Sequence, residues 1–335
     1  KQIRLRYRTP EKQEFFYSFI HYPMKKALVL FVILFSTLAF SQEKIEFSKA
    51  DIEINSLLKG TLYSPLKQSK KTNLVILIAG SGPTDRDGNQ KGLTNNSLKL
   101  LAEALANNGI AVYSYDKRIF AQIASGKLDE ASLSFDNFID DAKAVIQYFK
   151  NQKKYHSITI AGHSEGALIG MVAADGNADG YISIAGAGRP IDEVLVEQIG
   201  KQAPFLKEEV QKNLETLKSG TTFELKNQML ASLFRASVQP YMISWIKYNP
   251  QSEIKKLHVP TLLINGDKDI QVSVNDAQLL QQAKPDAQLK IISNMNHIFK
   301  EIKGDEAENK ASYTNPDLPI SKELPLIITT FIQSL

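Results

Sequence analysis

A serine that could act as a nucleophile stands in the stretch Gly162-His163-Ser164-Glu165-Gly166. The stretch has the pattern Gly-x-Ser-x-Gly, and it lies between an apolar run and a helical pattern of small residues. In that context the two glycines allow a sharp turn that holds the serine hydroxyl above a sheet. A serine that only caps the helix would satisfy the turn but would leave both glycines unexplained. A nucleophilic serine also needs a histidine base and an acid that orients it.

The base can be sought among the five histidines of the chain. Four stand in the N-terminal segment, at the entry of predicted strands or beside the serine: His21, His156, His258 and His163. We expect His163 to point away from the serine within the tight turn. His297 follows the apolar run 288–293, at the carboxyl end of a predicted strand, where open α/β folds place their sites. His297 is therefore the predicted base.

The acid is expected between the serine and the histidine, because an α/β-hydrolase carries its triad in the order Ser, Asp, His. Two candidates, Asp267 and Asp269, follow the apolar run 261–266. Asp267 directly follows Gly266, where an Asx-type turn would occupy its carboxylate with local backbone N–H groups. Asp269 lies further out and projects more readily toward His297. Spacing alone gives Asp269 only a modest advantage.

A glycine-containing loop, AGSGPTDRDGN at 79–89, follows the apolar run 74–78. Such a loop lets a backbone N–H approach a developing oxyanion, and we predict Ser81 as one donor and the N–H of Glu165 as the other. The charged residues 85–87 are expected to form ion pairs that fix the loop. The sequence lacks a third glycine or a Gly-Lys-Ser/Thr stretch for nucleotide binding, and it has no HExxH or clustered His/Asp pattern. We expect no metal and no cofactor.

The elements that must position these residues alternate along the chain. A hairpin is predicted over 45–63, strands near 74–80, 110–116, 157–162, 181–186, 261–266 and 288–293, and helices between them. Such alternation predicts an α/β fold, an α/β-hydrolase with a mostly parallel central sheet covered by helices on both faces. Between about 190 and 257, two or three helices are predicted without strands, which indicates a helical cap. One apolar stripe runs through Leu206, Val210 and Leu214, and another through Met229, Leu233 and Phe234. A dimer interface would leave the same stripes.

The N-terminal segment differs from the rest. Residues 24–41 have a basic start, an apolar stretch at 27–40 and small residues before Gln42, which is typical of a signal peptide. An uncleaved anchor is the alternative. Residues 1–23 are interpreted as an over-extended start. We therefore expect a periplasmic or secreted protein of residues 42–335, without stable membrane insertion once the leader is removed.

Composition narrows the functional class. The chain has 43% hydrophobic and 23% charged residues, which is typical of a folded globular protein. Its net charge of +4 comes from residues 1–41, which hold seven Lys or Arg and two Glu, so the remainder is close to neutral. Nucleic acid is therefore not an expected partner. The absence of cysteine excludes disulfides and a cysteine nucleophile.

Several separated motifs together resemble one family. GSGPTDRDGN, YDKR at 115–118, GHSEG, NGDKDIQV and NMNH look like those of bacterial α/β-hydrolase esterases related to the serine aminopeptidase-like and dienelactone hydrolase-like branches. The resemblance covers about residues 45–335. It implies Ser164 as nucleophile, Asp269 as acid and His297 as base, acting on a small-molecule carboxylic ester. Relatives usually continue YDKR with glycine and a small-residue turn, whereas this chain has Ile119-Phe120 beside the expected cleft.

Two other readings stay open. The same triad could serve a peptidase or an acyltransferase, because fold and triad do not specify the leaving group. A binding protein that kept the fold and lost catalysis is the third reading. Trp245, Tyr241 and Phe234 in the predicted cap could line an acyl pocket or could simply pack in a core.

Overall fold

The computed structural model describes residues 46–69 and 72–335. The predictions for the over-extended start at 1–23 and for the signal peptide at 24–41 lie outside the described residues. In the described part, no helix combines the length and the apolar character needed to cross a bilayer.

The described strands form one mostly parallel sheet in the order β1-β2-β4-β3-β5-β6-β7-β8. The first pair is an antiparallel hairpin, and its second strand also pairs antiparallel with β4. From β4 to β8 all neighbours are parallel. The bounds are β1 Phe47–Glu53, β2 Lys59–Pro65, β3 Leu74–Ile78, β4 Ala111–Tyr115, β5 Ile158–His163, β6 Gly180–Ile184, β7 Thr261–Gly266 and β8 Gln288–Ile292.

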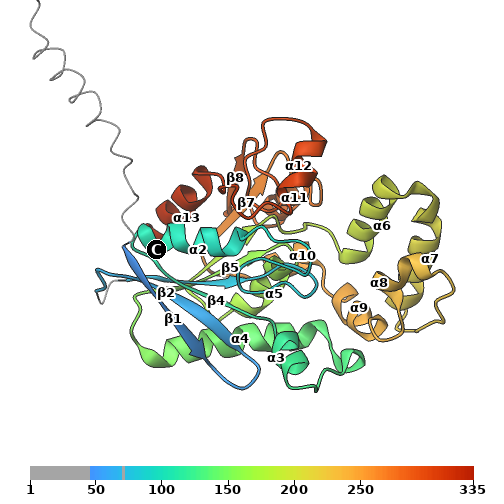
Figure 1. Cartoon of the computed structure of the whole chain (residues 1–335), viewed down its shortest axis with the longest axis horizontal. Helices are drawn as coiled ribbons and strands as arrows, with labels where there is room; N and C mark the ends of the chain where they lie inside the picture. Colours follow the sequence, from blue (N-terminus) through green and yellow to red (C-terminus); the bar gives the residue numbers. More distant parts are fainter. Residues whose placement is uncertain (1–45, 70–71) are drawn as a thin grey trace, which may run out of the picture. The chain divides into compact units, whose positions relative to one another are not determined.

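Helices cover both faces of the sheet. Successive strand residues point to opposite sides, so the apolar strands have two apolar faces to bury. Leu74, Ile76 and Ile78 of β3 belong to one buried apolar cluster, and Val75 and Leu77 belong to the other. The first cluster includes residues of α4 Phe135–Gln152, α5 Glu165–Ala174 and α11 Val274–Ala283. The second includes residues of α2 Ser97–Asn107 and α13 Glu323–Gln333. Figure 1 shows α2 and α13 on one side of the strands and α4 on the other.

A helical insertion separates β6 from β7, and we call its residues Ile191–Ile254 the cap. Its α-helices are α6 Ile191–Gln202, α7 Lys207–Lys218, α8 Ala231–Phe234, α9 Gln239–Ile246 and α10 Pro250–Ile254. The cap has an apolar cluster of its own, which contains Val210, Leu214 and Phe234. Helices α6 to α9 form a group beside the sheet (Figure 1), whereas Ile254 of α10 belongs to one of the two buried clusters of the sheet. The expected α/β-hydrolase architecture with a helical cap is therefore confirmed.

Some details differ from the prediction. The cap holds five α-helices in its described residues, not two or three. The expected stripe through Met229, Leu233 and Phe234 is wrong, because α8 is a single turn and Met229 is 66% exposed. Two further helices were missed, α3 Arg118–Ala124 and α12 Glu306–Ser312, and both are short and follow polar or mixed sequence.

Candidate active site

Ser164 occupies the turn between β5 and α5 in a backbone conformation that side chains rarely adopt, with φ 55° and ψ −118°. A Cβ at Gly162 would lie 2.0 Å from the carbonyl oxygen of Gly166, and a Cβ at Gly166 would lie 2.4 Å from that of Ile78. Neither position therefore has room for a side chain, and both require glycine. Ser164 stands at the N-cap position, yet its side chain caps no N–H of α5. The hydroxyl is left available, which a capping serine would not allow.

Asp269 and His297 are joined by a hydrogen bond. His297 Nδ1 lies 2.7 Å from Asp269 Oδ2, and the exposed fractions of the two side chains are only 4% and 0%. The other carboxylate oxygen of Asp269 accepts from the N–H groups of Gln271 at 2.8 Å and Val272 at 2.9 Å. The residues lie in the loops after β7 and β8, whose parallel pairing brings these loops together. An imidazole held in this way keeps its other nitrogen, Nε2, free of this carboxylate.

Asp269 contacts His297 as predicted, but the Asx-type turn predicted at Asp267 is not found there. The Asx-type turn forms at Asp269, through the bonds from Gln271 and Val272, and not at Asp267. Asp267 instead accepts from the backbone N–H of Asn294 at 2.6 Å, across the sheet end. A carboxylate has two oxygens, so Asp269 can serve the turn with one and His297 with the other.

His163 was placed outside the site by the sequence, and the structure puts it against His297. Its Nε2 lies 2.9 Å from the backbone oxygen of His297, and the two ring centroids are 4.8 Å apart. Burial, helped by the nearby His297 and Lys117, holds the pKa of His163 well below its usual value of 6.5. A neutral ring donating through Nε2 then fixes the backbone that carries His297. Its place as the last residue of β5 was the only sequence signal for this.

The loop after β3 brings Ser81 close to the turn at Ser164 between β5 and α5, which we call the elbow. A Cβ at the neighbouring Gly80 would lie 3.3 Å from the Cβ of Ser164, so the loop and the turn are in contact. Among the described residues, the N–H of Ser81 has no hydrogen-bond acceptor. The N–H of Glu165 belongs to the first residue of α5, where the helix offers no carbonyl. Both predicted donors are therefore available.

The charged residues 85–87 of this loop fix its conformation through ion pairs and a turn. Arg86 Nη2 contacts Asp116 Oδ2 at 2.7 Å, and its Nη1 contacts Asp51 Oδ1 at 3.2 Å. Asp85 Oδ1 accepts from the N–H groups of Asp87 at 2.9 Å and Asn89 at 2.8 Å. Arg86 pairs as expected, whereas Asp85 closes a turn.

Sequence reasoning missed a buried ion pair behind the elbow. Lys117, quoted above in YDKR, follows β4, and its Nζ lies 2.7 Å from Oε1 of Glu165. The two side chains are 5% and 2% exposed. Lys117 Nζ also donates to the carbonyl oxygens of Gly80 at 2.6 Å and Gly82 at 3.3 Å. No sequence signal marks this pair, because both residue types are usually solvated.

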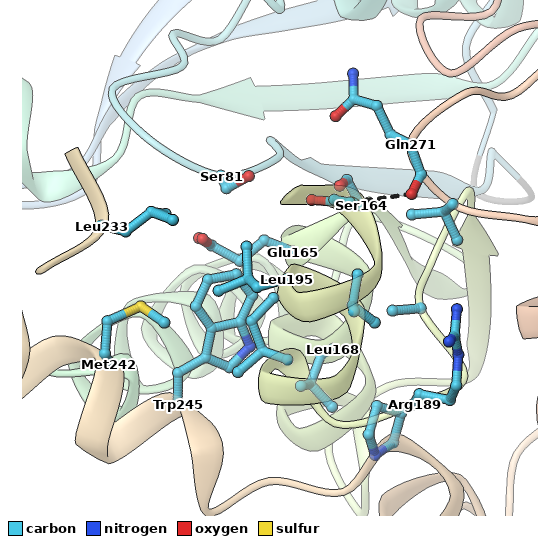
Figure 2. A pocket seen from close by; sticks show the side chains of 16 residues that line it. Ser81, Ser164, Glu165, Leu168, Arg189, Leu195, Leu233, Met242, Trp245 and Gln271 are labelled. Atoms are coloured by element: carbon cyan, nitrogen blue, oxygen red, sulfur yellow. Dashed lines mark hydrogen bonds between the residues drawn. The ribbon is translucent and has the colours of Figure 1, made fainter. Parts of the chain in front are cut away.

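Three cavities meet around the elbow. The narrow cavity, of about 150 Å³, is lined by Ser164 and by apolar residues that include Leu168, Leu195 and Trp245. The wide cavity, of about 490 Å³, runs under the cap past Ile119 and Phe138 and shares Trp245. Figure 2 shows Trp245 and Met242 on one side of α5, the helix that follows Ser164. Of the three aromatics considered for an acyl pocket, Trp245 and Tyr241 line cavities, whereas Phe234 is buried in the cap cluster.

The third cavity, of about 240 Å³, is the only one of these three lined by both Ser164 and His297. Uncharged polar side chains dominate its wall, among them Gln90, Gln271 and Tyr313. We call it the polar cavity. Ser81 lines all three cavities, so they converge at the loop after β3.

Comparisons with known proteins agree with this arrangement. The sequence profile of the family described as serine aminopeptidase, S33, matches residues 94–302, more than half of the chain. The esterase EstD of Thermotoga maritima is 28% identical over 282 residues, which cover 80% of this chain and 63% of EstD. The chain thus spans less than two thirds of the length of that curated relative.

Solved structures share the fold at low sequence identity. Est1E from Butyrivibrio proteoclasticus is 16% identical, with a TM-score of 0.53 over 85% of this chain and 99% of that chain. Carboxyl esterase 2 from Tuber melanosporum is 15% identical, with a TM-score of 0.53 over 89% of each chain.

Proposed function

The chain belongs to the serine aminopeptidase S33 family, and from this premise we propose that it is a serine hydrolase that cleaves carboxylic esters through an acyl-enzyme intermediate. The observation that carries the proposal is the 2.7 Å hydrogen bond between Asp269 and His297, with Ser164 and His297 lining one cavity. The curated relative named as an esterase supports the choice of ester over amide.

The proposed reaction assigns one role to each residue. The Ser164 hydroxyl attacks the ester carbonyl while His297 Nε2 takes its proton. The carbonyl oxygen becomes an oxyanion that accepts hydrogen bonds from the N–H groups of Ser81 and Glu165. His297 then returns the proton to the departing alcohol, and water repeats the sequence on the acyl-enzyme. Asp269 fixes the imidazole tautomer and stabilises the imidazolium.

This proton path sets the direction of the substrate. The alcohol must leave beside His297, and His297 lines the polar cavity. The acyl group stays on Ser164 and extends into the apolar narrow cavity, beside the two oxyanion donors. We therefore assign the acyl group to the Trp245 side and the alcohol to the Tyr313 side, where Tyr313 lines the polar cavity and not the narrow one.

Labelling with a fluorophosphonate separates this function from the binding-protein reading. The purified protein should become labelled, and Ser164→Ala should lose both labelling and ester hydrolysis. Ser125→Ala, at an exposed serine, is the matched control. A folded protein that neither reacts with the probe nor hydrolyses short esters contradicts the proposal. Matched ester and amide substrates with one acyl group distinguish the esterase from the peptidase reading.

Export is a separate proposal, supported by the basic and apolar pattern of residues 24–41. N-terminal sequencing of exported protein should begin at Gln42. Retention of the apolar stretch 27–40 in a membrane fraction would contradict cleavage and favour an anchor.

A further inference from the structure

Lys117 is a buried cation to which the proposed reaction gives no role. Its residue is 4% exposed, and burying an ammonium group is unfavourable unless the charge and its three N–H groups are satisfied. Nζ finds three acceptors, Gly80 O at 2.6 Å, Glu165 Oε1 at 2.7 Å and Gly82 O at 3.3 Å. All three belong to the two segments that supply the oxyanion donors.

The bond to Gly80 fixes a particular N–H. The carbonyl of Gly80 and the N–H of Ser81 belong to one peptide unit, which is trans, since the described backbone contains no cis bond. In a planar trans peptide the C=O and the N–H point in opposite directions. An ammonium that holds the Gly80 oxygen therefore turns the Ser81 N–H to the side away from Lys117. The cation also polarises the peptide, which makes that N–H a better donor to an anion.

The ion pair between Lys117 and Glu165 involves the residue that supplies the second oxyanion donor. Glu165 supplies its backbone N–H, while its carboxylate is buried under the cap beside Tyr241. Burial, and then the charge of Glu165 and a hydrogen bond to it, raise the pKa of the Tyr241 phenol. A carboxylate near the oxyanion would repel it if it stood alone. Lys117 compensates that charge and ties Glu165 to the loop of Ser81.

We infer that Lys117 is a positioning residue that assembles the oxyanion hole by joining the Gly80–Ser81 peptide to Glu165, so that both N–H groups meet one substrate oxygen. The inference rests on the proposed function. It gives Lys117 no part in proton transfer and no contact with the substrate.

The test removes both charges at once, because loss of one partner would leave the other buried and unpaired. Lys117→Met/Glu165→Gln keeps an acceptor for Tyr241 and removes the ammonium. Loss of one oxyanion donor costs roughly 10²–10³ in kcat, and we expect a loss of that order with KM within ~3-fold of wild type. The affinity for a trifluoromethyl ketone, which forms an oxyanion adduct on serine, should fall by a similar factor.

The control is a neighbouring ion pair of similar burial. Arg118 Nη2 contacts Asp141 Oδ1 at 2.7 Å, with side chains 17% and 6% exposed. Arg118→Met/Asp141→Asn should lower the thermal stability and leave kcat per folded molecule and the ketone affinity close to wild type. A purely structural role for Lys117 predicts the same behaviour for both double variants.

A folded Lys117→Met/Glu165→Gln protein with wild-type kcat and ketone affinity would overturn the inference. If that variant does not fold, Lys117→Gln/Glu165→Gln is measured in its place. Two glutamine amides carry no charge, and a glutamine side chain at position 117 is too short to contact the Gly80 carbonyl. Failure of the proposed function looks different, since then the folded wild-type protein is neither labelled at Ser164 nor active on short esters.

Discussion

One carboxylate oxygen of Asp269 faces His297 Nδ1 at 2.7 Å, while the other is held by two backbone N–H groups of its own loop. The carboxylate is thus oriented before any substrate binds, and the imidazole is held in the tautomer that leaves Nε2 free to take a proton.

Asp269→Asn is expected to lose on the order of 10⁴ in turnover while the protein stays folded, because an amide favours the wrong imidazole tautomer. Turnover is measured on a short-chain ester and corrected for the folded fraction. The matched control is Asp267→Asn, which weakens one hydrogen bond to Asn294 N and should cost about 1 kcal/mol of stability. Collapse of turnover in Asp267→Asn with survival in Asp269→Asn would transfer the role to Asp267.

Gly162→Ala is expected to reduce turnover by more than ~100-fold, because the new Cβ would lie 2.0 Å from Gly166 O and displace Ser164. Gly220→Ala in the cap is the control. Gly220 has φ 82° and open space around its Cβ position, so the change should cost about 1–2 kcal/mol of stability and spare turnover. Equal losses of turnover in both variants would argue against the tight elbow.

The stability of the fold should fall as the pH drops below about 6.5. The pKa of His163 is held well below 6.5 by burial, so the ring stays neutral in the folded protein while the unfolded chain binds a proton there. The unfolded state is then favoured by up to ~1.4 kcal/mol per pH unit. Urea unfolding at several pH values should give a shallower pH dependence for His163→Gln. An equal change in His156→Gln, at an exposed position, would contradict this explanation.

Trp245→Leu should broaden the range of acyl groups that the enzyme accepts, because the indole lines both the narrow and the wide cavities. We expect kcat/KM to rise for longer or bulkier acyl groups relative to acetyl esters, measured with one common alcohol. Phe234→Leu is the control, since Phe234 is fully buried in the cap cluster and should affect only stability. An unchanged acyl profile in folded Trp245→Leu would place the acyl group elsewhere.

The polar cavity predicts a preference in the alcohol part of the ester. With a constant acyl group, esters of alcohols that carry further hydroxyls should have lower KM than esters of alkyl alcohols. Tyr313→Phe should reduce this preference, because the Tyr313 hydroxyl accepts from Gln271 Nε2 at 3.1 Å and keeps its own proton to donate. The ratio of kcat/KM for a glycerol ester and a propyl ester measures it, and a ratio unchanged by the variant counts against the assignment.

The order of elements and the triad candidates were predictable for a physical reason. Buried parallel strands appear as continuous apolar runs, and the residues after their carboxyl ends meet at one edge of the sheet. That logic placed Ser164, His297 and the two candidate aspartates at one edge of the sheet, and the resemblance to the esterases selected Asp269. Spacing along a chain does not reveal side-chain direction, so the contact of His163 with His297 was missed.

The buried pair of Lys117 and Glu165 was unpredictable for a different reason. Forty-eight residues separate the two, and each type is normally solvated, so only the packed loops reveal that they meet. The departure at Ile119-Phe120 was noticed in the sequence, and the structure places Ile119 on the wall of the wide cavity. The arrangement of the cap helices could not be predicted from the sequence, because their apolar residues pack mainly against one another.

The order of the strands has a consequence during biosynthesis. Strand β8 closes one edge of the sheet and is the last of the described strands to leave the ribosome, and the loop with His297 follows it. Strand β5 and Ser164 emerge on the order of ten seconds earlier. Until the final segment docks, the nascent chain carries a serine without its proposed base. Under the proposed function, ester hydrolysis should therefore begin only after the segment that carries His297 has docked.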